Sequence, residues 1–489
     1  MRARISFGLP CRKHHLTRSV RLCDVVSQMT RRRRRLVLLI CCMSLLIVSL
    51  DNTIVNVALP SLGHDLHAPI SGLQWTVDAY TLTLASLLML AGSTADRIGR
   101  RRTFQTGLVV FTAGSLLCSL APSLGWLVAA RIVQAVGGSM LNPVAMSIIT
   151  NTFTDRRERA QAIGVWGGVV GVSMALGPVV GGLLTDTVNW RAIFWINVPI
   201  GLLALFLTWR FVPESKAPSA RRLDPIGQLL VIVLLGTLTY GIIEGRAAGP
   251  AVSAVGFILA AAALAALIIW ELRRPEPLID MRFFRSAPFS GAAVMAVSGF
   301  ASLGAFLFLN TLYLQSHRGL SALAAGLCTL PVAGITTVVG PLSGRLVGTR
   351  GPRLPSVVAG VCLAVAGWLL SQVTLTTPLP LLLGIYVIFG VGFGLLNPPI
   401  TNTAVSGMPI AQAGVAAAVA STSRQVGQSL GVAIAGSMAS SAAAHRVNAL
   451  YGLIVLAVAL LTTGRWARAT AERTAARLAE SPQVTLSQG

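Results

Sequence analysis

The stretch Gly92-Ser-Thr-Ala-Asp96-Arg97-Ile-Gly99-Arg100-Arg101-Arg102 joins two long apolar runs, residues 72–91 and 103–121. Two glycines bracket an Asp-Arg pair, and a run of arginines follows. A tight cytoplasmic turn explains the arginines, because Lys and Arg accumulate on the cytoplasmic side of membranes. It does not explain Asp96, which we expect to cap the positive end of the next helix and to pair with arginines as a breakable latch. The candidate gating residues are Gly92, Asp96, Arg97, Gly99, Arg100 and Arg101.

The composition of the whole chain is that of a polytopic membrane protein. Charged residues make up 11% of the 489 residues, against about 25% in soluble chains, and the mean hydropathy is +0.73. The net charge of +23 would suggest nucleic-acid binding if the basic residues formed one face, but they occur in small clusters between apolar runs. We therefore expect neither a nucleic-acid partner nor a soluble enzyme. The seven cysteines contain no Cys-x-x-Cys pair and predict neither a disulfide framework nor a metal site.

Fourteen apolar runs of about 18–25 residues are long enough to cross a bilayer as helices. They are residues 36–60, 72–91, 103–121, 125–149, 160–184, 192–212, 227–244, 249–270, 287–310, 321–345, 354–372, 378–399, 413–438 and 447–464. We therefore predict an all-α integral membrane protein with fourteen transmembrane helices.

Basic residues predict the orientation of these spans. With the N-terminus inside, 27 of the 39 Lys and Arg residues fall in cytoplasmic segments, in addition to the six of residues 1–30, whereas four fall outside and two, Arg131 and Arg424, lie within spans. Both termini are then cytoplasmic, as the tails 1–35 and 465–489. The cluster Arg31 to Arg35 alone is sufficient to hold the N-terminus inside, so we expect translation from Met29 to give full function.

Two short motifs recur at a distance of eight predicted spans. The loop at Gly92 has an echo in Gly340-Pro-Leu-Ser-Gly344-Arg345-Leu346, and Leu141-Asn142-Pro143 recurs as Leu396-Asn397-Pro398. Two six-helix halves related by a parallel repeat, with two helices inserted between them, explain this spacing. The predicted parts are an N-terminal half (36–212), a linker with the two inserted helices (213–286) and a C-terminal half (287–464). We expect the insert to be peripheral, since only Glu244 brings charge to its outer margin.

Three charged residues fall inside the predicted spans at one depth. At 1.5 Å of rise per residue, Asp51 lies about 22 Å into the first span, and Asp78 and Arg131 lie about 9 Å from the outer ends of theirs. Charge inside a membrane costs roughly 3 kcal/mol and indicates function by default. An arginine stabilises a charged carboxylate and burial stabilises a protonated one, so movement of Arg131 relative to either Asp could load and release a proton. The alternative is a static cluster that holds three helices together. No histidine falls within a predicted span, so carboxylates must carry the proton.

The fifth span contains Ser173-Met-Ala-Leu-Gly177-Pro178-Val-Val-Gly181-Gly182. Small residues at helical spacing usually permit close packing of helices. The Gly-Pro step followed by a second pair of glycines is a more specific pattern.

These motifs resemble those of the major facilitator superfamily. The loop is similar to the cytoplasmic signature G-x-L-A-D-R-x-G-R-R, with Thr94 at the usual Leu. Arg131 and Gln134 match R-x-x-Q-G, with Ala135 at the usual Gly, and the fifth span is similar to the antiporter motif G-x-x-x-G-P-x-x-G-G, with Ser173 replacing the first Gly. The segment 50–60 contains the element L-D-x-T-I-V-N-V-A-L-P of the fourteen-span drug:proton antiporter family, the EmrB/QacA-like multidrug efflux transporters.

This resemblance covers residues 36 to about 440 and implies a function. In the family the arginine of the fourth span is implicated in proton transfer, and the antiporter motif, here Gly177, Pro178, Gly181 and Gly182, distinguishes exporters from uptake carriers. We expect a proton-coupled antiporter that exports hydrophobic or cationic compounds from the cytoplasm by alternating access.

The expected partners are a small-molecule substrate, protons and membrane lipids, and no cofactor or metal is expected. We expect a monomer in the plasma membrane. Two alternatives stay open, a proton-coupled exporter of an endogenous metabolite and a membrane sensor or scaffold that keeps the fold without transport.

Overall fold

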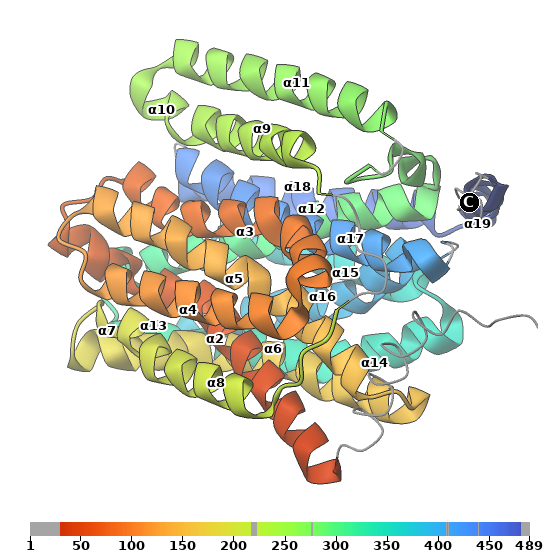
Figure 1. The fold of residues 1–489 in the computed structure, drawn as a ribbon. Coiled ribbons are helices and arrows are strands. Elements are labelled where there is room, and N and C mark those ends of the chain that lie inside the picture. Colours follow the sequence, from red (N-terminus) through yellow and green to blue (C-terminus); the bar gives the residue numbers. More distant parts are fainter. Residues whose placement is uncertain are drawn as a thin grey trace, which may run out of the picture.

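The computed structural model describes residues 30–216, 223–274, 277–406, 408, 410–438 and 440–480, and the regular structure of these residues is helical (Figure 1). The predicted start at Met29 lies outside them. The N-terminal half is built from α2 (Arg31–Asp65), α3 (Ile70–Ile98), α4 (Arg100–Ser119), α5 (Leu124–Thr152), α6 (Arg156–Thr187), α7 (Ala192–Trp195) and α8 (Asn197–Phe211).

The inserted segment and the C-terminal half follow. The insert contains α9 (Pro225–Ile243), α10 (Gly245–Ala248), α11 (Pro250–Leu272) and the short η1 (Met281–Arg285). The C-terminal half contains α12 (Ala287–Thr311), η2 (Leu312–His317), α13 (Ala322–Cys328), α14 (Leu330–Arg350), α15 (Arg353–Ser371), α16 (Leu379–Val405), α17 (Ile410–Ser437) and α18 (Ser441–Thr462), and α19 (Arg465–Glu480) follows it.

Twelve helical segments of the described chain are long and apolar enough to cross a membrane, so the protein is a multi-pass membrane protein. Fourteen were predicted. The other two correspond to α4 and α17, which form helices of 20 and 28 residues but do not meet the same criterion of composition.

Local sequence explains where several helices begin. Thr30 accepts a hydrogen bond from the backbone N–H of Arg33 at the start of α2, and Asp155 accepts two at the start of α6. Such side chains satisfy N–H groups that have no partner within the helix. One expectation was wrong, because His445, which falls outside the predicted spans, lies buried in the first turns of α18. The C-terminal tail begins as the helix α19.

Each half has its own packed core. In the N-terminal half α2 packs along α6 and α4 packs along α5, while in the C-terminal half α12 packs along α17 and α15 along α18. Aromatic rings fill the second core, where Phe306 stacks on Phe389 at 4.4 Å and meets the ring of Tyr386 edge-on. The inserted helices lie on one side of this bundle, where α9 contacts α3 and α17 and α11 packs outside α9 (Figure 1).

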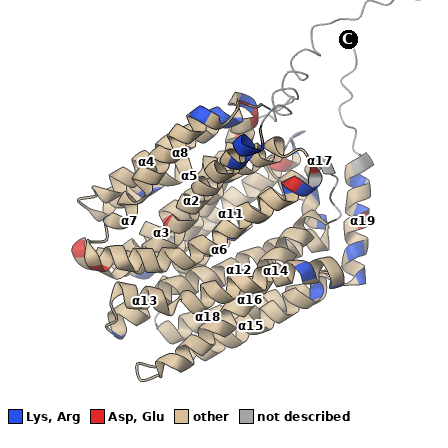
Figure 2. Ribbon diagram, turned by 90° about the horizontal axis from the view of Figure 1, so that it is seen from below, with Lys and Arg blue, Asp and Glu red and all other residues tan. Residues whose placement is uncertain are grey.

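The basic residues gather at one end of the bundle, the end that carries α19 (Figure 2). There Arg34 at the start of α2 forms an ion pair of 2.6 Å with Glu158 at the start of α6. At the opposite end Asp65 pairs with Arg191 at 2.6 Å. The two ion pairs therefore show that α2 and α6, the first and fifth of the predicted spans, run in the same direction.

The two halves are joined by hydrogen bonds at the end remote from α19. Gln74 Nε2 donates to the carbonyl of Ala433 at 2.7 Å, and Gln315 Nε2 donates to the carbonyl of Val57 at 2.8 Å. Asp186 accepts from the backbone N–H of Leu323, at the start of α13, at 2.8 Å. Within the described residues, the hydrogen bonds found between the halves all lie at this end.

Candidate functional site

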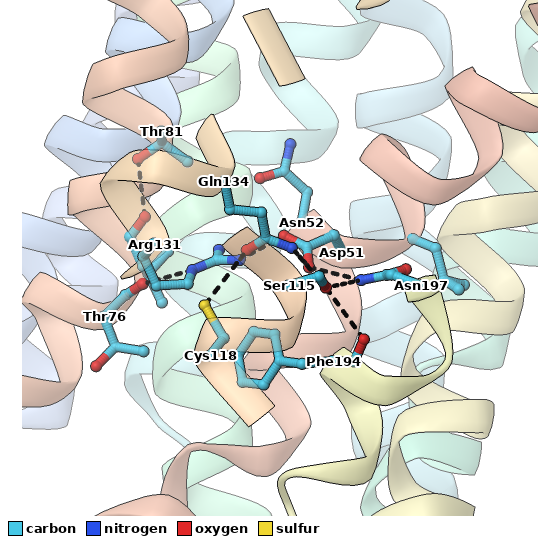
Figure 3. A network of polar contacts seen from close by, with 12 residues as sticks. Asp51, Asn52, Thr76, Thr81, Ser115, Cys118, Arg131, Gln134, Phe194 and Asn197 are labelled. Carbon is cyan, nitrogen blue, oxygen red and sulfur yellow. Dashed lines mark hydrogen bonds and ion pairs between the residues drawn. The ribbon is translucent and has the colours of Figure 1, made fainter. Parts of the chain in front are cut away.

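A buried ion pair joins α2 to α5. Arg131 is 1% exposed and Asp51 is fully buried. Arg131 Nη1 donates to Asp51 Oδ2 and to Gln134 Oε1, the latter at 2.7 Å (Figure 3). Arg131 and Gln134 are three residues apart on α5, so both project from one face of that helix. The structure thus brings together two of the three charged residues predicted at one depth.

Two amides complete the environment of the Asp51 carboxylate. Gln134 Nε2 donates to Asp51 Oδ1 at 2.8 Å, and Asn197 Nδ2, from the first residue of α8, donates to the same oxygen at 3.1 Å. The carboxylate therefore accepts three hydrogen bonds, one of them from a cation. A buried charge needs such partners, because water is absent to solvate it.

Ser115 of α4 extends this network to a fourth helix. Its hydroxyl accepts from Gln134 Nε2 and from Asn197 Nδ2, both at 3.1 Å, and donates to the carbonyl of Phe194 at 3.0 Å (Figure 3). No sequence pattern indicated Ser115, since serine is common in membrane helices. Asn197 lies in the stretch Trp195-Ile-Asn197-Val-Pro199, in which nothing indicated its partner.

The other side of Arg131 contacts α3. Arg131 Nε donates to the carbonyl of Thr76 at 3.2 Å, and its guanidinium lies 4.1 Å from the centroid of the Tyr80 ring. Cation–π contact of this kind stabilises a desolvated guanidinium by about 2 kcal/mol. Arg131 is thus held by an anion, an amide, a carbonyl and an aromatic face.

Asp78 is separate from this network. It is fully buried on α3, Thr81 Oγ1 donates to its Oδ1 at 3.4 Å, and its Oδ2 has no hydrogen-bond partner. The side chain lies near Ser429 of α17, in the other half of the bundle. The equal depth predicted a cluster of three charges, and the structure instead shows one ion pair and a carboxylate at the boundary between the halves.

The predicted gating loop is a sharp turn between α3 and α4. Gly99 has φ of +124°, a conformation that side-chain-bearing residues rarely adopt, which explains a glycine here. Asp96 lies in the last turn of α3 and forms an ion pair with Arg100 at 3.1 Å, so the predicted pairing is present. Gly92 has open space beside it and the side chain of Arg97 is exposed.

The predicted cap was wrong, because Glu214 and not Asp96 serves the start of α4. Glu214 Oε1 accepts from the backbone N–H of Arg101 at 3.1 Å, and its Oε2 lies 3.8 Å from Arg102 Nε. The backbone N–H of Arg100 also donates to the carbonyl of Ser215, at 2.9 Å. The chain that leaves α8 therefore fixes the turn between α3 and α4.

The glycines of the antiporter motif lie where α6 contacts its neighbours most closely. A Cβ on Gly177 would lie 1.9 Å from Thr53 Oγ1, and one on Gly181 would lie 2.6 Å from a side-chain carbon of Ile54. A Cβ on Gly182 would lie 2.5 Å from the carbonyl oxygen of Ala322, in α13. The carbonyl of Pro178 also faces α13, 2.2 Å from a Cβ built on Gly326. The motif thus packs α6 between α2 and the other half of the bundle.

The inserted helices carry more charge than predicted. Glu244 lies at the end of α9 and accepts from Trp75 Nε1 at 2.8 Å. At the other end, Glu271 and Asp224 are both buried, and Arg274 pairs with Asp224 at 3.4 Å. Glu271 was overlooked because it falls one residue beyond the predicted span.

Comparisons with known proteins identify the class of this chain. The sequence profile of the Major Facilitator Superfamily matches residues 41–432. The chain is 37% identical over 398 residues to "Multidrug resistance protein Stp" of Mycobacterium tuberculosis, covering 81% of this chain and 74% of that protein. It is 35% identical to "Tetracenomycin C resistance and export protein" of Streptomyces glaucescens, covering 82% of this chain and 74% of that protein.

A solved structure shares the fold. The crystal structure of a D-xylose-proton symporter superposes with a TM-score of 0.64 at 16% identity, covering 87% of this chain and 96% of that one. The profile match and the identity to these relatives show that this chain belongs to the major facilitator superfamily. It is a transporter and not an enzyme.

Proposed function

We propose that the protein is a proton-coupled antiporter that exports hydrophobic or cationic drugs from the cytoplasm by alternating access. The observation that carries the proposal is the buried pair of Asp51 and Arg131, with Asp78 at the boundary of the halves. The names of the relatives, which refer to multidrug resistance and to export, support the direction of transport. The direction of transport is also supported by the antiporter motif, whose glycines lie where α6 contacts α2 and α13.

In this proposal Asp51 and Asp78 bind the transported protons, and Arg131 is the counter-charge that sets how readily Asp51 gives its proton up. A carboxylate that exchanges its proton must alternate between a partnered and an unpartnered environment. The latch of Asp96 and Arg100, together with Gly92, Arg97, Gly99 and Arg101, would open and close with the inner ends of the halves.

We also propose fourteen membrane crossings, with both termini cytoplasmic in the plasma membrane. At 1.5 Å per residue the 20 residues of α4 span about 30 Å, which matches the hydrocarbon core. α4 packs on α5 and α8, and α17 packs on α12 and α3. A helix covered by protein need not be as apolar as one that faces lipid.

The proposed protein is a monomer. Its parts are the two halves, the linker and the two tails, which are residues 36–212 and 287–464, 213–286, and 1–35 and 465–489. With the termini inside, the hydrogen bonds between the halves lie at the outer side, which corresponds to a state closed to the outside.

Inverted membrane vesicles from a host without its own drug pumps test this proposal. The vesicles acidify their lumen by respiration, and ethidium or tetraphenylphosphonium is then added. Proton release from the lumen, reported by quinacrine fluorescence, is expected only when the protein is present.

The two alternatives give other results in this assay. An exporter of an endogenous metabolite would release protons with an extract of the host's own small molecules and not with the drugs. A sensor or scaffold would release none with either. The cost of keeping Asp51, Asp78 and Arg131 inside a membrane argues against a protein without transport.

A further inference from the structure

A second arginine lies within α17, a proposed membrane span, without an acidic partner. Arg424 is the fifteenth residue of α17, about 21 Å from the start of that helix. Its Nη2 donates to Thr401 Oγ1 and its Nη1 lies 3.5 Å from Ser421 Oγ, while its Nε is buried without a hydrogen-bond partner. The guanidinium lies 5.9 Å from the centroid of the Phe300 ring. No carboxylate of the described residues lies within ion-pair distance of Arg424.

The contrast with Arg131 shows how incomplete this environment is. Arg131 has a carboxylate, an amide oxygen and a carbonyl as acceptors. Arg424 has only neutral hydroxyls, which cannot balance its charge. A cation at this depth is costly unless an anion or water compensates it.

Asp78 approaches α17, but it does so on another side of that helix. It lies near Ser429, five residues further along the helix. Five residues correspond to about 7.5 Å of rise and about 140° of rotation. Arg424 is therefore not oriented toward Asp78.

The surroundings of Arg424 are polar and accessible. Asn397 and Thr401 are one turn apart on α16, and both are exposed although α16 is a membrane-crossing helix. Amide and hydroxyl groups at that depth face water or ligand and not lipid. Next to them, Phe300 packs edge-on against Phe393 with 5.1 Å between the ring centroids, so an apolar surface adjoins the polar one.

We propose that Arg424, Thr401, Asn397 and Phe300 form a subsite for the acidic group of an amphipathic substrate. The guanidinium would bind a carboxylate or a similar oxyanion through two N–H donors, with hydroxyl and amide donors beside it. The aromatic ring would contact the apolar body of the same molecule. This inference rests on the proposed transport function, and it extends the substrates to acids.

Matched probes that differ in one group test the subsite. The full chain, purified in lipid nanodiscs, is titrated with pyrenebutyrate, pyrenebutyramide and pyrenebutylamine, and binding is read by fluorescence polarisation. The wild type should bind the acid at least tenfold more tightly than the amide. Arg424→Gln should remove this preference and leave amide binding unchanged. Arg424→Lys should keep part of it, because the charge remains without the planar fork.

Arg446→Gln provides the matched control, since Arg446 is an exposed arginine on α18. It should bind all three probes as the wild type does. Equal affinity of the wild type for the acid and the amide would overturn the subsite. An equal loss of all three probes in Arg424→Gln would also overturn it, because it would show that Arg424 only holds α16 against α17.

Failure of this inference is distinguishable from failure of the transport proposal. The preference for the acid is an equilibrium property that needs no proton gradient. Ethidium-driven proton release in the wild type tests transport separately. A protein that releases protons with ethidium but does not prefer the acid keeps the proposed function and loses the subsite.

Discussion

Replacing Asp51 with Asn distinguishes a proton carrier from a static charge pair. Asn has the shape of Asp, but one of its two terminal atoms is a donor. The carboxylate accepts from Arg131, Gln134 and Asn197. Whichever way the Asn amide is turned, its NH2 group therefore faces at least one of these donors. Asp51→Asn also leaves the cation of Arg131 without its counter-ion.

The size of the effect follows from burial. Removal of one partner from a buried ion pair typically costs about 3–5 kcal/mol, because the other charge stays buried and unpaired. Arg131 is 1% exposed and cannot reach water without moving a helix. We therefore expect a lower Tm for Asp51→Asn. The double variant Asp51→Asn/Arg131→Gln removes the unpaired charge and should recover much of this loss.

Transport should behave differently from stability. If Asp51 carries protons, both the single and the double variant should lose ethidium-driven proton release in inverted vesicles, although each should still bind ethidium. A static pair predicts that transport recovers together with Tm in the double variant. Proton release by Asp51→Asn at a rate near that of the wild type would refute the assignment of Asp51.

Three further substitutions test other parts of the structure. Asp78→Asn should abolish proton release and leave Tm nearly unchanged, since Asp78 has no cation to leave unpaired; wild-type release would exclude this carboxylate. Glu244→Gln should retain transport in the vesicle assay, because an amide oxygen can still accept from Trp75 Nε1. A complete loss of proton coupling would instead show that the transport path includes the inserted helices. Glu214→Ala removes the acceptor for the Arg101 N–H and should cost about 1 kcal/mol, seen as a lower Tm, and an unchanged Tm would contradict the capping role.

The helices were predictable from the sequence because a bilayer requires long apolar segments whatever the fold. All fourteen predicted spans correspond to helices, and the two that are least apolar, α4 and α17, are packed against several neighbours. In the proposed fourteen-span topology, their composition reflects contact with protein, and hydropathy alone would not identify them as spans. Pairing of Asp96 with Arg100 was also predictable, since the two residues lie close together in the sequence.

Contacts between distant segments were not predictable in this way. Glu214 is separated from Arg101 by 113 residues and lies in a segment without a motif. Any carboxylate near a helix start could serve the same N–H groups, so local pattern favoured the nearer Asp96. Ser115 and Asn197 were missed for the same reason, because each meets Asp51 or its partners only through the packing of four helices.

The position of Asp78 shows that the depth of a residue along its helix does not decide which neighbouring helix it faces. Helix rise placed Asp51, Asp78 and Arg131 at one level, but the rotation of α3 decides which of its residues face α5. Thr76 and Tyr80, one turn apart, contact Arg131. Asp78 lies midway between them, about 200° of rotation from each, and so faces the other way, toward α17.

This rotation assigns the two carboxylates to different environments. Asp51 is enclosed within the N-terminal half, whereas Asp78 lies on the contact of α3 with α17 of the other half. If the halves rock as rigid bodies, the partners of Asp51 stay in place while those of Asp78 change. In the proposed mechanism, alternating access then acts first on the protonation of Asp78, and Asp51 responds only if α3, which holds Arg131 through Thr76 and Tyr80, also shifts within the N-terminal half. Loss of proton release in Asp51→Asn with full release in Asp78→Asn would contradict this order.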